Sequence, residues 1–297
     1  MVNPLSLITT PIELCSNGNP VSGGTGFYYS STWDEVTGTF LVTNYHVLTG
    51  NNPTQRTSTP IGDSIVFYYH MDKDDPKPVV GIEIPLFTNS GKQIWIDHSN
   101  SVVDIALIPM FFSLPVKPEW QTVGKNFEDP TIDVSPSDPV TLIGYPRMYF
   151  DKKNALPIYK TGSVASEYSY DFDGDPCFII DVSAFAGNSG SPVFSIQKNA
   201  QIITEQILIK APGSIVKFLG VYSAGIEIVE SFPIQQIKSK KEGIILNLDM
   251  QLGIVWKDYL IEEIIKQHSY KEYEKVAQEL LQKKQFHYKI SRGLNLL

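Results

Sequence analysis

The chain has 297 residues, 42% of them hydrophobic, and 24 Lys and Arg stand against 32 Asp and Glu, for a formal net charge of −8. This length and hydrophobic content suffice for one large β domain or for two β-barrels that share an interface. The acidic balance argues against a general nucleic-acid-binding protein. Because no apolar run is long enough to cross a bilayer, we expect no membrane-spanning segment.

Short β-branched and aromatic runs, separated by turn-forming Gly, Pro, Asn and Asp, recur along most of the chain. They predict strands at residues 26–29, 39–42, 64–69, 93–96, 105–109, 140–143, 178–182, 192–195, 219–222 and 252–256. Strands at this spacing indicate an all-β barrel or sandwich. The proline-rich stretch 115–139 is typical of a connector, so we place a boundary near residue 125, and residues 230–247 are expected to form an exposed insertion.

Beyond Trp256 the apolar residues repeat at helical spacing, which predicts two helices. The first helix is marked by Leu260, Ile261, Ile264 and Ile265, and the second, over about 270–285, by Tyr273, Val276 and Leu280. The second helix carries more charge than apolar surface, so we expect it to lie outside the hydrophobic core and to serve as a docking site for a regulatory protein.

Residues 187–192 read Gly-Asn-Ser-Gly-Ser-Pro and carry the most specific functional signal in the chain. A serine flanked by glycines at a tight turn can present its Oγ to a substrate while the N–H groups of the turn point at the same place. This pattern suits Ser189 as a nucleophile, with the amides of Gly187 and Ser189 as an oxyanion hole. A serine hydroxyl needs a histidine base and a carboxylate to become reactive.

Both partners are found upstream. His46 ends an apolar run, 40–48, and Asp104 precedes another, 105–108. The resulting chain order of histidine, aspartate and serine differs from that of the α/β-hydrolases, which also require Gly-x-Ser-x-Gly where this chain has Ser191. The order and the motif together exclude the α/β-hydrolase interpretation.

With these motifs the chain resembles the trypsin-like (chymotrypsin-fold) serine peptidases, particularly bacterial ones, over about residues 10–265. Further resembling motifs are residues 24–27 (Gly-Thr-Gly-Phe), 142–146, 161–163 and 220–225. The resemblance implies a mainly β fold of two six-stranded antiparallel β-barrels with C-terminal helices. We expect residues 1–125 to carry His46 and Asp104, residues 126–267 to carry Ser189 and a closing helix, and residues 268–297 to form an extra helical tail.

The resemblance also implies a serine endopeptidase that acts on protein or peptide substrates. In this interpretation Ser189 attacks, His46 transfers the proton and Asp104 orients His46. The substrate-binding residues would be Ser183, Ala184 and Phe185 in the specificity pocket, and Ser223, Ala224 and Gly225 on the strand that pairs with the substrate. Because Ser183 is uncharged, we expect cleavage after uncharged residues of small to medium or aromatic size. The alternative is a catalytically silent fold that acts as a protein-binding scaffold.

No cofactor or metal is predicted. The acidic clusters 171–175 and 72–75 lack the twelve-residue calcium loop with its terminal Glu, and the histidines have no paired ligand spacing. The first basic residue is Arg56, so the amino terminus lacks the positive region of a secretory signal, and only Cys15 and Cys177 are present. We therefore expect a cytoplasmic bacterial protein with two free thiols.

Overall fold

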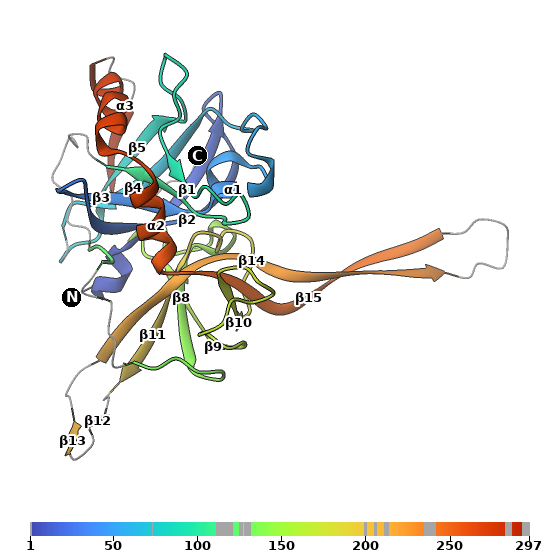
Figure 1. The fold of residues 1–297 in the computed structure, drawn as a ribbon. Helices are drawn as coiled ribbons and strands as arrows, with labels where there is room; N and C mark the ends of the chain where they lie inside the picture. Colours follow the sequence, from blue (N-terminus) through green and yellow to red (C-terminus); the bar gives the residue numbers. More distant parts are fainter. Residues whose placement is uncertain are drawn as a thin grey trace.

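In the computed structural model, the chain is described over residues 2–72, 74–110, 121–124, 127, 132–198, 201–204, 207–210, 214–234, 242–282 and 287–292. Its strands form an eight-stranded antiparallel sheet, a closed six-stranded barrel and a separate two-stranded hairpin (Figure 1). The predicted mainly β fold is confirmed, and one of the two expected six-stranded barrels is present as a closed barrel. The other expected barrel is an eight-stranded antiparallel sheet among the described residues, because β16 from the C-terminal end of the chain adds to its edge. The boundary near residue 125 and much of the expected connector lie outside the described residues.

The first unit is a sheet with the strand order β16-β5-β4-β1-β2-β3-β7-β6. Its strands are β1 (Thr9–Ser16), β2 (Asn19–Trp33), β3 (Val36–Thr43), β4 (Ser64–His70), β5 (Pro78–Pro85), β6 (Ile96–Asp97), β7 (Ala106–Pro109) and β16 (His287–Arg292). The sequence did not predict β1 because Pro11 and Glu13 interrupt its apolar residues, although seven of its eight residues are buried. The prediction at 93–96 was largely wrong, since only Ile96 of that run lies in a strand.

The second unit is the closed barrel, with the strand order β10-β15-β14-β11-β8-β9. Its strands are β8 (Pro139–Gly144), β9 (Ile158–Val164), β10 (Cys177–Asp181), β11 (Pro192–Lys198), β14 (Ser214–Ile234) and β15 (Glu242–Lys257). The separate hairpin pairs β12 (Gln201–Thr204) with β13 (Ile207–Lys210). Buried residues from all six barrel strands, among them Leu142, Phe178 and Val255, form a core of their own. The expected six-stranded barrel is therefore present in this unit.

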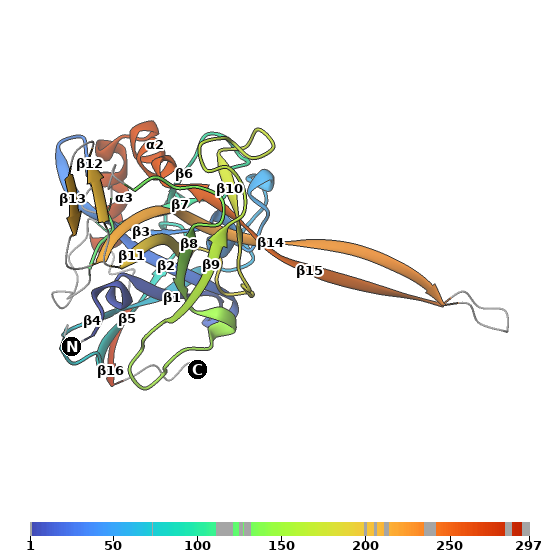
Figure 2. The same ribbon diagram turned by 90° about the horizontal axis from the view of Figure 1, so that it is seen from below.

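Strands β14 and β15 run on beyond the barrel as a paired arm. Their antiparallel register continues from Glu227 opposite Asp249 to Ile234 opposite Glu242. Figure 2 shows this arm extending away from both units, as Figure 1 does from another side. The expected insertion at 230–247 is thus a continuation of two barrel strands, and residues 235–241 lie outside the described residues.

The described residues also form three α-helices, α1 (Tyr45–Thr49), α2 (Tyr259–Gln267) and α3 (Tyr270–Gln282), and short 3-10 helices at Pro4–Leu7, Pro53–Gln55 and Pro146–Met148. Both predicted C-terminal helices are confirmed, but the expectation that the second lies outside the core is wrong. On α3, Tyr273, Val276 and Leu280 are buried in the main hydrophobic cluster. The Tyr273 hydroxyl also lies within hydrogen-bonding distance of the carbonyl oxygens of Ile94 (2.9 Å) and Pro109 (3.1 Å). The total charge of the helix concealed a continuous apolar stripe on one face.

No helix among the described residues is long and apolar enough to cross a membrane. In the same part of the chain, no group of three or more His, Cys, Asp and Glu is placed to hold a metal ion.

Candidate active site

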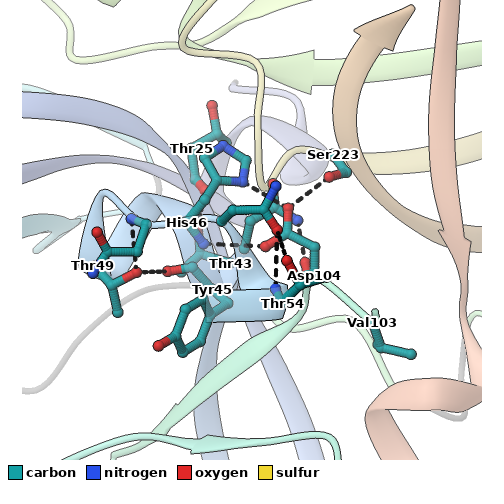
Figure 3. Close-up of polar contacts among 12 residues, drawn as sticks. Thr25, Thr43, Tyr45, His46, Thr49, Thr54, Val103, Asp104 and Ser223 are labelled. Carbon is teal, nitrogen blue, oxygen red and sulfur yellow. Dashed lines mark hydrogen bonds and ion pairs between the residues drawn. The ribbon is translucent and has the colours of Figure 1, made fainter. Parts of the chain in front are cut away.

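His46 and Asp104 come together at one end of the first sheet. His46 is the second residue of α1, directly after β3, and Asp104 stands just before β7, the strand paired with β3. The Nδ1 atom of His46 lies 2.6 Å from Asp104 Oδ2, and the backbone N–H of His46 donates to Asp104 Oδ1 at 3.1 Å (Figure 3). Two separate contacts therefore fix the carboxylate relative to the imidazole ring.

A third contact reaches Asp104 from the barrel. The Ser223 hydroxyl, on β14, donates to Asp104 Oδ2 at 2.6 Å (Figure 3). Asp104 is only 3% exposed. Burial acts to raise the pKa of its carboxyl, but the hydrogen bonds from His46 and Ser223 and the charge interaction with His46 outweigh burial, so the pKa lies below its ordinary value. The buried group is therefore a carboxylate at neutral pH.

An ionised Asp104 determines which tautomer of neutral His46 is favoured. The carboxylate can only accept, so the ring donates from Nδ1 and keeps a lone pair on Nε2. The His46 side chain is 33% exposed, in contrast to the buried Asp104. A neutral imidazole in this arrangement can take a proton from a group that approaches Nε2.

Ser189 lies in the turn between β10 and β11, and glycine is required on both sides of it. Gly187 has φ +92° and Gly190 has φ +86°, values that residues with a Cβ rarely adopt. A Cβ on Gly187 would also lie 2.5 Å from the carbonyl oxygen of Tyr145, and one on Gly190 would lie 2.0 Å from that of Thr25. The glycines let this turn pack directly against neighbouring backbone.

Two amides of the turn remain available as donors. The carbonyl of Ala186 accepts from the N–H of Arg147 at 2.6 Å, and the carbonyl of Asn188 accepts from the N–H of Ser191 at 2.9 Å. In a trans peptide the C=O and N–H groups point in opposite directions. The Gly187 N–H shares a peptide with the Ala186 carbonyl, and the Ser189 N–H shares one with the Asn188 carbonyl. Both N–H groups therefore point away from the N–H donors of Arg147 and Ser191. Neither amide hydrogen has an acceptor among the described residues. The turn can therefore donate two hydrogen bonds to a negatively charged oxygen.

Thr25 anchors this turn to the first sheet. Its backbone N–H donates to the carbonyl of Ser189 at 2.8 Å. Its hydroxyl donates to the carbonyl of Gly187 at 2.8 Å and accepts from the N–H of Tyr145 at 3.0 Å. Thr43 in turn donates to the carbonyl of Thr25 at 2.7 Å. The sequence marked Thr25 only as part of a motif, so its positioning role is a finding of the tertiary structure.

Ser189 is half-buried and lies close to the other predicted residues. A Cβ placed on Gly24 would lie 2.7 Å from the side chain of Val47 and 3.0 Å from the carbonyl oxygen of Ser189. The turn and the residue after His46 thus flank the same glycine. Among the described residues, the Ser189 hydroxyl and His46 do not form a hydrogen bond. Hydrogen bonds between catalytic groups are often long when no substrate is bound.

The predicted substrate-binding residues lie on two accessible segments. Ser183 and Phe185 are exposed and Ala184 is half-buried, all three just before the Ser189 turn. On β14, Ser223 is buried whereas Ala224 and Gly225 are exposed. The pairing of β14 with β11 ends at Val221 opposite Pro192, so the described part of the chain provides no strand beside residues 223–225 on that side.

The structure also places two cationic residues that the sequence did not indicate. Arg147 and Lys160 both lie against the ring of Phe185. No local sequence motif includes either residue in a binding role, and their contact with Phe185 is visible only in the tertiary structure. Cys15 and Cys177 are buried free thiols, and burial, reinforced by nearby carboxylates, raises the pKa of each to about 11, so neither is a reactive thiolate at neutral pH.

Comparison with known proteins gave a family match and remote likenesses to many solved structures, two of which are described below. The trypsin-like peptidase domain family matches residues 24–201, more than half of the chain. A crystal structure of the serine endoprotease from Yersinia pestis is 12% identical, with a TM-score of 0.46; the match covers 88% of this chain and 62% of that one, less than two thirds of its length. The inactive form of the Rv3671c protease is 17% identical, with a TM-score of 0.42 and coverage of 89% and 92%. A search of curated proteins found no match.

Proposed function

The chain belongs to the trypsin-like peptidase domain family, and from this premise we propose that it is an active serine endopeptidase of protein or peptide substrates. His46, Asp104 and Ser189 are its catalytic residues. One observation carries the proposal: the buried Asp104 carboxylate is bound at once by the ring and the backbone N–H of His46 and by Ser223. Such an arrangement holds an imidazole in one tautomer and stabilises its protonated form.

The proposed reaction begins when Ser189 Oγ attacks the scissile carbonyl carbon and its proton passes to His46 Nε2. Asp104 stabilises the imidazolium that forms. When the tetrahedral intermediate collapses, the C–N bond breaks and the imidazolium gives its proton to the leaving amine. In the second half a water molecule attacks the acyl-enzyme ester, His46 takes the proton of that water, and Ser189 Oγ is released with its proton restored.

The amides of Gly187 and Ser189 are the proposed oxyanion hole. Both are free of acceptors among the described residues, and both belong to a turn fixed by Thr25 and Arg147. Donors held in place before the reaction cost no reorganisation when charge develops on the carbonyl oxygen. Loss of one such donor typically lowers the rate by about 10²–10³.

The substrate backbone is proposed to add as a strand beside Ala224 and Gly225. These residues are exposed and lie where β14 has passed the end of its pairing with β11. Strand addition binds main chain and leaves selectivity to side-chain pockets, here the segment formed by Ser183, Ala184 and Phe185.

Docking of a regulatory protein on the C-terminal tail is a further part of the proposal. The buried face of α3 is already occupied by the first sheet. The surface left for such a partner is the edge strand β16, where Tyr288 is 56% and Ile290 is 51% exposed.

Labelling with a fluorophosphonate probe tests the catalytic assignment. The wild-type chain should be labelled and should hydrolyse a casein-type substrate, whereas Ser189→Ala should lose labelling and about 10⁶-fold in rate while remaining folded. Ser191→Ala is a matched control two residues away and should still be labelled. A folded wild-type protein that neither reacts with the probe nor hydrolyses casein would favour the silent scaffold.

A further inference from the structure

Two cations border the segment proposed as the specificity pocket, and we call Arg147 and Lys160 the cationic rim. The Nζ atom of Lys160 donates to the carbonyl of Ser183 and lies 4.8 Å from the centre of the Phe185 ring. The guanidinium carbon of Arg147 lies 5.4 Å from the centre of the same ring. The rim therefore comes from two consecutive elements of the chain, the turn after β8 and β9, which meet on an aromatic side chain of the later segment before Ser189.

Neither charge of the rim is neutralised by the described part of the chain. The ion pairs found there are those of His46, Arg56, His98 and Lys257. An ammonium group has three donors and a guanidinium has five, and the one engaged by a described residue is the Lys160 bond to a carbonyl. In a protein with a net charge of −8, two adjacent cations without a carboxylate partner are available for an external anion.

The rim is attached to the proposed site through the backbone. The N–H of Arg147 donates to the carbonyl of Ala186 at 2.6 Å, and that peptide carries the Gly187 amide assigned to the oxyanion hole. Lys160 holds the carbonyl of Ser183 at the start of the same segment. Phe185, between them, is 44% exposed. A substrate whose scissile carbonyl reached the oxyanion hole would thus bring its neighbouring side chains beside the rim.

We propose that Lys160 and Arg147 are specificity-determining residues that select peptides with a Glu or Asp side chain next to the scissile bond. The proposal rests on the peptidase function proposed above. A substrate carboxylate would accept hydrogen bonds from the ammonium or, in bidentate fashion, from the guanidinium. A substrate Lys or Arg would meet two like charges. The sequence analysis expected a preference for uncharged residues from Ser183 alone. An acidic preference replaces it here, because Lys160 and Arg147 bring positive charge to the pocket segment from other parts of the chain.

Internally quenched peptides that carry Glu, Gln or Lys at each position around the cut test the proposal. The wild-type kcat/KM should favour Glu over Gln by about tenfold to a hundredfold at one position beside the cut, with Lys cleaved most slowly. Lys160→Gln and Arg147→Gln should each lower the ratio of Glu to Gln, and the double variant should bring it close to one. Lys152→Gln is the control, because Lys152 is exposed on a nearby turn and has no contact with Phe185 in the described structure.

Two results would overturn the proposal: an active enzyme that cleaves Glu and Gln peptides equally at every position, or a Glu preference that the double variant retains. Arg147→Gln keeps the test valid if Lys160→Gln fails to fold, because the Arg147 side chain makes no hydrogen bond with a described residue. Binding of the same peptides to Ser189→Ala, followed by fluorescence anisotropy, needs no turnover. Tighter binding of Glu peptides that weakens in high salt supports the rim even if the wild-type chain proves inactive, whereas equal binding of Glu and Gln peptides refutes it.

Discussion

The Thr25 hydroxyl offers the sharpest test of how the proposed oxyanion turn is held. Thr25 is fully buried, and its Oγ1 joins the carbonyl of Gly187 to the N–H of Tyr145. Thr25→Val replaces the hydroxyl with a methyl group of similar size and leaves both groups buried without a partner. At about 1–3 kcal/mol for each unsatisfied group, the variant should lose about 2–6 kcal/mol of its free energy of unfolding.

The same substitution should affect catalysis. Without the bond to its carbonyl, Gly187 is held only through the neighbouring bonds of Ala186 and Ser189, and the Gly187 amide is a proposed oxyanion donor. We expect kcat to fall by up to about 10²–10³, with KM little changed because the substrate-binding segments are untouched. Thr25→Ser is the control: it keeps both hydrogen bonds and loses one methyl group, at a cost of about 1 kcal/mol.

Denaturant unfolding and steady-state kinetics, measured where both variants are folded, separate the two effects. The reasoning fails if Thr25→Val and Thr25→Ser have the same kcat. It also fails if the two variants unfold at the same denaturant concentration.

Three further predictions follow from burial and charge. Leu280→Ala, which empties a core position 2% exposed, should cost about 2–5 kcal/mol in urea unfolding, whereas the adjacent Leu281→Ala, at a position 36% exposed, should cost less than about 1 kcal/mol; equal losses would contradict the packing of α3. The folded-state pKa of Asp104 lies below the ordinary value of 3.8, so its contribution to stability is present above that pH and is lost as pH falls through the folded value. Melting temperatures recorded in acid should therefore fall less steeply for Asp104→Asn than for the wild type, and parallel curves would argue against the assignment. Finally, the 297-residue chain should be active without proteolytic trimming. The buried Asn188, unlike an aspartate at the same position, cannot form an ion pair with the amino group that trimming would create. A strict requirement for cleavage near residue 1 would refute this.

Local patterns predicted most of the strands and both C-terminal helices. The β-branched and aromatic runs of β2, β3 and β4 were visible in the sequence because they stand between turn-forming residues. The helical repeat of Leu260, Ile261, Ile264 and Ile265 was visible because one face of α2 is buried. The same reasoning missed β1, in which Pro11 and Glu13 interrupt the apolar run. It also placed α3 outside the core, because the charge of the whole helix was weighed instead of the apolar stripe of Tyr273, Val276 and Leu280.

The sequence by itself determined the chemistry that the chain can offer: a serine between glycines, an upstream histidine and aspartate, and their order along the chain. These signals are local, since the turn around Ser189 needs glycine at φ values that other residues avoid. Only the tertiary structure decided what surrounds them. Thr25 reaches the turn at Gly187 from 162 positions away, and Lys160 reaches Ser183 from 23 positions away. The Thr25 contact depends on how the two β units pack together, and the Lys160 contact depends on how β9 and β10 lie side by side in the barrel. No periodicity or motif in the sequence encodes either arrangement.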